Sequence, residues 1–167
     1  MENIIEIRKT VQIDDFDAIS RIYVLSWKTA YAGIMPQRFF DGLAENCRSD
    51  NLKRNAGDSL VLCIDGAYAG ISAVCGARDV NMQGWGEVVS IYLLPEYFGK
   101  GYGKLLLSVA VEELVNIGYQ KLYLWVLEEN LRARVFYEKH GFICTSDKKT
   151  LNIGGKDLIE VRYIYNM

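Results

Sequence analysis

The chain has 167 residues, of which 50% are apolar and 24% are charged, and this composition is typical of one globular domain spanning residues 1–167. Its formal net charge of −2 argues against a general nucleic-acid binder that works by neutralising phosphates. No apolar run approaches the ~20 residues that span a bilayer, and the start MENIIEIRKTVQI carries charges inside its apolar pattern, so we expect neither a membrane partner nor a signal peptide.

The first part of the chain predicts a strand followed by helices. Residues 5–13 alternate between apolar and polar side chains, which is the pattern of a half-buried strand. Asp14 offers an N-cap for a helix whose apolar residues recur at helical spacing to about Tyr31. After the break AGIMPQ, a shorter helix is predicted over residues 39–47, and the polar stretch RSDNLKRNAGD follows it.

From Ser59 the apolar pattern changes to that of strands. SLVLCI and AYAGISAVCGA predict two strands joined at Asp65 and Gly66, because this dipeptide suits a tight hairpin turn. GEVVSIYLL is nearly continuous in apolar residues, which favours a central strand covered on both faces.

The second half predicts helix, strand, helix and hairpin. The first helix ends at Gly118 and has an apolar face made of Leu106, Leu107, Ala110, Val111, Leu114 and Ile117. KLYLWVL predicts a strand, NLRARVFYEKH a short helix ended by Gly141, and residues 142–165 a hairpin turning at IGGKD. This order predicts an α/β (α+β) fold: a single mixed, mostly antiparallel sheet with helices on both faces and one parallel strand–helix–strand crossover.

The stretch PEYFGKGYGKLLL carries glycines at every second position, between a strand and a helix. Such a turn presents free backbone N–H groups and the positive end of a helix dipole, which suits an anion such as a phosphate, although a plain flexible turn fits the pattern too. A P-loop is excluded because Leu105 follows Lys104 where a hydroxyl is needed. A dinucleotide fingerprint is disfavoured because Lys104 occupies the third glycine's place.

The same stretch resembles motif A of the GNAT superfamily of N-acetyltransferases, in which a strand and Pro-Glu-x precede [Arg/Gln]-x-x-Gly-x-[Gly/Ala] and a helix. NLRARVFYEKHGF also matches the family's Asn-x-x-Ala-x-x-Phe-Tyr-x-x-x-Gly-Phe, so the resemblance covers residues 85–142 firmly. Phe98 departs from the motif, because it stands where the family usually has Arg or Gln. Lys100 and Lys104 could supply the missing charge.

The resemblance implies a GNAT-like fold and acetyl-CoA (coenzyme A) as co-substrate, with no metal. The turn would hold the pyrophosphate, the strand backbone at 91–93 would pair with the pantetheine arm, and Asn130 would orient that arm or cap its own helix. The expected cofactor-binding residues are Ile91, Tyr92, Leu93, Phe98, Gly99, Lys100, Gly101, Tyr102, Gly103, Lys104, Asn130, Ala133 and Phe136.

The implied reaction is direct transfer of an acetyl group to a primary amine of a small molecule or peptide. An amine with a pKa of ~10.4 must lose a proton before it attacks, and the leaving thiolate must gain one. Glu87 is the predicted base, with Glu128 and Glu129 in reserve, and a strand-end carboxylate at the sheet rim is the structural alternative. Tyr137 is the predicted acid, or a core tyrosine beside Phe136.

Other features narrow the remaining possibilities. His140 is the only histidine, and the four cysteines include no CxxC pair, so nucleophilic triads and metal sites have little support, and reduced, mostly buried thiols in a cytoplasmic protein are expected. Trp27 and Tyr31 are the predicted walls of the acceptor site. A non-catalytic acyl-CoA-binding sensor and a nucleotide-binding oxidoreductase module stay open as alternatives, and a homodimer is compatible with the sequence.

Overall fold

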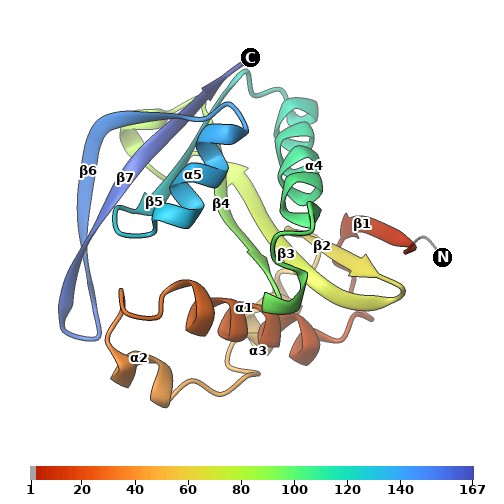
Figure 1. Cartoon of the computed structure of the whole chain (residues 1–167). Coiled ribbons are helices and arrows are strands. Elements are labelled where there is room, and N and C mark those ends of the chain that lie inside the picture. The colour runs from red at the N-terminus through yellow and green to blue at the C-terminus, as the bar shows by residue number, and fades with distance from the viewer. Residues whose placement is uncertain (1–2) are drawn as a thin grey trace.

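The computed structural model describes residues 3–167 and contains one seven-stranded sheet in the order β1-β2-β3-β4-β5-β7-β6 (Figure 1). Its strands are β1 (Ile5–Lys9), β2 (Ser59–Ile64), β3 (Ala67–Gly76), β4 (Gly86–Leu93), β5 (Lys121–Leu127), β6 (Ile143–Ile153) and β7 (Lys156–Asn166). Only β4 and β5 pair in parallel, and every other neighbouring pair is antiparallel. The predicted mixed, mostly antiparallel sheet is therefore confirmed.

Helices cover both faces of the sheet (Figure 1). They are α1 (Phe16–Ala30), α2 (Gln37–Asp41), α3 (Ser49–Arg54), α4 (Tyr102–Ile117) and α5 (Leu131–Lys139), with short 3-10 turns at Val80–Met82 and Pro95–Tyr97. β2 is buried along its whole length, because Val61 packs with α1 whereas Leu60 and Leu62 pack with α4. Burial of each such side chain contributes roughly 1.5–3 kcal/mol to the stability of the fold, so β2 stabilises the packing of both helical layers on the sheet.

β4 is the middle strand of the sheet, as predicted, but its covering is incomplete. Gly86 to Val88 are buried, whereas residues 89–92 are only half-buried. The turns on either side behave as the sequence indicates: Asp65 and Gly66 both have positive φ, and so do Gly154 and Gly155 in the second hairpin.

The N-terminal strand is shorter than predicted, because it ends at Lys9 and the chain turns before α1. The N-cap of α1 is Asp15 rather than Asp14. Asp14 instead accepts hydrogen bonds from Arg8, at 2.6 Å, and from the N–H of Val11. Ile13, expected on the buried face, is 94% exposed, so the alternation of residues 10–13 does not report a strand.

Three further expectations need correction. The helix predicted over 39–47 ends at Asp41, before Gly42, and the polar stretch after it contains α3, which is anchored by the buried Leu52. Ile117 is 58% exposed and does not belong to the buried face of α4. Cys47 and Cys144 are exposed, so the thiols are not mostly buried. Within residues 3–167 no helix is long and apolar enough to cross a membrane.

Candidate active site

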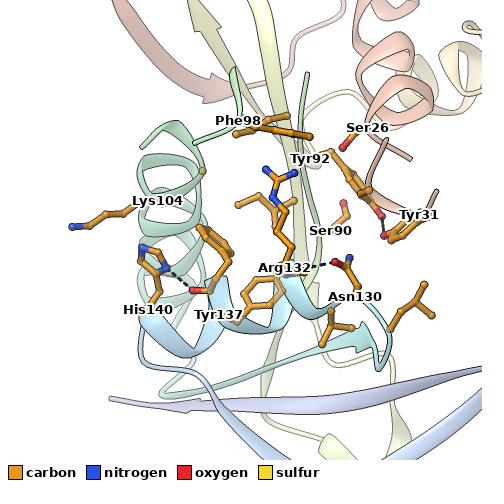
Figure 2. A pocket seen from close by; sticks show the side chains of 18 of the residues that line it. Ser26, Tyr31, Ser90, Tyr92, Phe98, Lys104, Asn130, Arg132, Tyr137 and His140 are labelled. Carbon is orange, nitrogen blue, oxygen red and sulfur yellow. Dashed lines mark hydrogen bonds between the residues drawn. The ribbon is translucent and has the colours of Figure 1, made fainter. Parts of the chain in front are cut away.

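The two parallel strands at the centre of the sheet separate along their length. β4 and β5 are paired only at Gly86 with Leu122 and Glu87 with Tyr123. Beyond this point the register of β3 against β4 shifts by one residue, which leaves Val89 as a bulge that bends β4. The strands then diverge, and a cavity of about 450 Å³ lies at the opening, lined by residues of β4, β5, α1, α5 and the glycine turn (Figure 2).

The glycine turn closes one end of this cavity. Gly99 and Gly101 have φ values of 72° and 86°, which side chains disfavour. Gly101 is the N-cap of α4, and no side chain of residues 3–167 caps the helix there, so its first N–H groups are available to bind an anion. Gly103 instead allows close packing against Phe136, since a Cβ there would lie 3.4 Å from the ring of Phe136.

A cation reaches this end from α5 rather than from the turn. The guanidinium of Arg132 stacks on the ring of Phe98, 3.9 Å from the ring centroid, and both residues line the cavity (Figure 2). Lys104 also lines the cavity, but its side chain is directed away from it in Figure 2. Phe98 therefore acts as the surface on which Arg132 rests.

Tyr137 lies in the cavity wall, at 8% exposure, on the same helix as Arg132. Burial raises the pKa of its hydroxyl well above the ordinary value, and the neighbouring Tyr92 adds to this effect. The phenol is therefore protonated at neutral pH and can donate a hydrogen bond or a proton. Asn130 lines the same wall, and its Oδ1 accepts a hydrogen bond from the N–H of Ala133, so it also caps α5.

His140 is the C-cap of α5 and lines the cavity together with Arg132 and Phe136, which precede it at a spacing of four. Its Nδ1 lies 2.6 Å from the carbonyl oxygen of Phe136, and its ring lies 4.6 Å from the ring of Phe136. Because a carbonyl only accepts, Nδ1 carries the proton that it donates. A place in the cavity wall was not predicted for His140 from the sequence.

The other end of the cavity is lined by Ser26, Ala30, Tyr31, Tyr92, Trp125 and Glu160. The hydroxyls of Tyr31 and Tyr92 lie 3.1 Å apart, and Figure 2 shows the pair across the cavity from His140. Burial raises the pKa of both tyrosines. Trp27 does not line the cavity. Its ring packs edge-on against the ring of Tyr92, with ring centroids 6.1 Å apart, and so contacts a residue of the cavity wall.

Glu87, the predicted base, lies outside the cavity wall. Its carboxylate accepts hydrogen bonds from Arg78 Nη2 at 2.7 Å and from the hydroxyl of Tyr123 at 2.7 Å, and its side chain is only 3% exposed. Burial alone raises its pKa, but the bonds from Arg78 and Tyr123 outweigh burial and lower it. A buried, ion-paired carboxylate of low pKa is a poor proton acceptor, so this placement argues against Glu87 as the base.

The predicted cofactor-binding residues fall into those that line the cavity and those that do not. All of them line the cavity except Lys100, whose ammonium lies 5.9 Å from the ring of Tyr97, and Tyr102, whose hydroxyl accepts a bond from Asn3. Glu128 and Glu129 lie outside it as well, and each is paired with a lysine. The sequence interpretation missed Ser26, Ala30, Val89, Ser90, Trp125, Val126, Leu127, Arg132, His140 and Glu160.

Comparison with known proteins gives consistent matches. The model of the acetyltransferase (GNAT) family matches residues 17–142. The chain is 31% identical over 136 residues to an uncharacterised N-acetyltransferase of Archaeoglobus fulgidus, covering 79% of this chain and 88% of the relative. It is 29% identical over 142 residues to spermidine N(1)-acetyltransferase of Thermoplasma acidophilum, covering 83% and 88%. The crystal structure of PaiA N-acetyltransferase from Thermoplasma acidophilum in complex with coenzyme A matches with a TM-score of 0.70 at 25% identity, over 98% of this chain and 99% of that one.

Proposed function

The chain belongs to the GNAT acetyltransferase family, and we propose that it moves the acetyl group of acetyl-CoA directly to a primary amine of a small molecule or peptide. The observation that carries the proposal is that one and the same cavity has uncapped backbone N–H groups and Arg132 at one end and the protonated Tyr137 in its wall. These are the groups that a polyphosphate donor and a thiolate leaving group require.

The donor end would hold the phosphates of CoA. The first N–H groups of α4 and the turn at Gly99 and Gly101 would bind the phosphate oxygens, and the guanidinium of Arg132 adds a positive charge there. Among residues 3–167, no strand pairs with the edge of β4 beyond Glu87 on the β5 side, so this backbone is available to the pantetheine arm. Because Arg132 supplies a cation, the replacement of the usual Arg or Gln by Phe98 is no argument for a non-catalytic module.

Tyr137 would be the acid of the reaction. As the amine nitrogen bonds to the acetyl carbon, the carbon–sulfur bond breaks, and the phenol of Tyr137 donates its proton to the sulfur. The amine nitrogen loses protons in the same turnover, so the phenol can be restored from solvent or from the acceptor. Burial of the ring raises the pKa of the phenol, so Tyr137 still holds its proton when the sulfur leaves.

The proposal is tested by following free-thiol release from acetyl-CoA with a panel of primary amines, peptides and aminoglycosides. We expect release with at least one amine, and thermal stabilisation by CoA and acetyl-CoA but not by NAD or ATP. Stabilisation by NAD without stabilisation by CoA would falsify the proposal. Stabilisation by CoA with no thiol release from any acceptor would instead favour the acyl-CoA-binding sensor.

A further inference from the structure

The charged groups of the cavity wall are divided between its two ends. Among the lining residues of the described range 3–167, the cationic side chains are Lys104 and Arg132, both at the end of the glycine turn. The acidic one is Glu160, which lies at the other end with Tyr31 and Trp125. The lining cations thus suit an anionic ligand at one end. The carboxylate of Glu160 suits a cationic group at the other end, where the guanidinium of Arg162 also lies 4.7 Å from the centroid of the Trp125 ring.

Trp125 and Glu160 project from the face of the sheet opposite to α4 and α5. Leu124 and Val126 pack with Leu107 and Tyr137 under those helices, so Trp125 between them points the other way. Val161 belongs to the same packed cluster, and its neighbour Glu160 therefore shares the face of Trp125. The cavity wall reaches both faces of the sheet, so two substrates can approach the gap between β4 and β5 from opposite sides.

A primary ammonium is already seated on these two side chains. The Nζ of Lys149, on the neighbouring strand β6, lies 3.1 Å from Oε2 of Glu160 and 4.4 Å from the centroid of the Trp125 ring. A carboxylate combined with an aromatic face is a recognition site for an ammonium group. Lys149 does not line the cavity, whereas Glu160 and Trp125 do.

We propose that Glu160 and Trp125 form the subsite for the acceptor's ammonium group, and that the acceptor displaces the ammonium of Lys149 from them. The proposal rests on the proposed function and narrows its acceptor to cationic primary amines that carry no carboxylate beside the amine, because Glu160 would repel one. Tyr31 lines the same cavity, and its hydroxyl lies 3.1 Å from that of Tyr92.

The subsite also accounts for the protons of the reaction. The acceptor enters as an ammonium, and its nitrogen must lose two protons to become an amide. At the subsite, one of them is lost to solvent, and the other replaces the proton that Tyr137 gives to the sulfur. One nitrogen–carbon bond forms, one carbon–sulfur bond breaks, and one proton is released in each turnover.

The test compares each cationic amine with the amino acid of the same side chain: phenethylamine with phenylalanine, agmatine with arginine, and 1,4-diaminobutane with ornithine. With saturating acetyl-CoA, thiol release should favour the amine by at least about tenfold in kcat/KM. Glu160→Gln should raise the KM of the amine by about tenfold, remove this preference and leave the KM of acetyl-CoA unchanged. Lys149→Met should lower the KM of the amine, because the internal competitor is gone.

Lys148→Met and Glu45→Gln are matched controls, since these residues form exposed ion pairs with Glu128 and Arg21. Both controls should leave the KM of the amine unchanged. An unchanged amine KM in Glu160→Gln, or a wild-type preference for the amino acids, overturns the subsite while turnover continues. Absence of thiol release with every acceptor overturns the proposed function instead. Calorimetric titration of phenethylamine into the CoA-loaded wild type and Glu160→Gln then decides the subsite, and equal affinity for the two overturns it.

Discussion

The two ends of the cavity are built in different ways. The donor end consists of one continuous turn, residues 98–104, and one helix, α5, and much of its chemistry comes from backbone N–H groups. The acceptor end is assembled from side chains of α1, β4, β5 and β7, which lie far apart in the sequence. A site made of backbone N–H groups depends on glycines and a helix terminus, and short sequence motifs reveal both. A site made of side chains depends on which strands become neighbours in the sheet, and short motifs do not reveal this.

The first prediction concerns the residue between the two ends. Tyr137→Phe should lower kcat by at least about tenfold and leave the Kd of CoA nearly unchanged, because the substitution removes the proton donor and keeps the buried ring. The rate of thiol release gives kcat, and calorimetric titration of CoA gives its Kd. Unchanged turnover would remove Tyr137 from the acid role and leave it as a core tyrosine.

The second prediction tests whether α5 supplies the cation of the donor end. Arg132→Ala should weaken CoA binding by about tenfold, since a charge-assisted bond to a phosphate is worth about 1.5–3 kcal/mol. Phe98→Ala should weaken it less, and the double variant should be no weaker than Arg132→Ala alone, because Phe98 acts through Arg132. Lys100→Met serves as the control, since Lys100 lies outside the cavity wall. Additive losses would contradict the stacked arrangement.

The contrast between the two ends also explains what the sequence could predict. The sheet, the helices α4 and α5, both hairpin turns and the cavity-lining residues from Ile91 to Lys104 follow from periodicity, glycine positions and two motifs. Arg132 could have been found as well, because Arg132, Phe136 and His140 recur at a spacing of four on one helix face. Glu160 could not, because nothing in the sequence of β7 tells that it lies beside β5 rather than at the edge of the sheet.

Glu87 is a second example of a site property that the sequence does not reveal. Its position at the start of the central strand follows from the sequence, but its partners do not, because Arg78 reaches it from the loop after β3 and Tyr123 from β5. Sequence position alone therefore suggested a free base, and the tertiary contacts turn it into a buried ion pair. This difference leads to the third prediction.

The third prediction is that Glu87→Gln affects stability more than the chemistry of either end. Loss of the charge leaves Arg78 with a weaker partner and should lower the free energy of unfolding by about 1–3 kcal/mol. Because Glu87 lies outside the cavity, any fall in kcat at a temperature where the variant is folded should be the same at every pH. Urea unfolding and a pH profile of thiol release measure these effects. A rate defect that shrinks as pH rises would restore Glu87 as the base.

The last prediction concerns Asp14, which lies outside the cavity wall, and checks whether a loss of stability by itself changes CoA binding. The Arg8 guanidinium is the main cause that lowers the pKa of Asp14 to about 2, against the opposing effect of burial. Since the pKa is lowered in the folded state, Asp14 contributes stability above pH ~4, and this contribution is lost as pH falls toward about 2. Asp14→Asn should therefore cost about 1–2 kcal/mol at pH 7 and progressively less below pH ~4, measured by urea unfolding. Asp14→Asn and the exposed Asp50→Asn should both keep the wild-type Kd for CoA at pH 7, because neither residue lines the cavity.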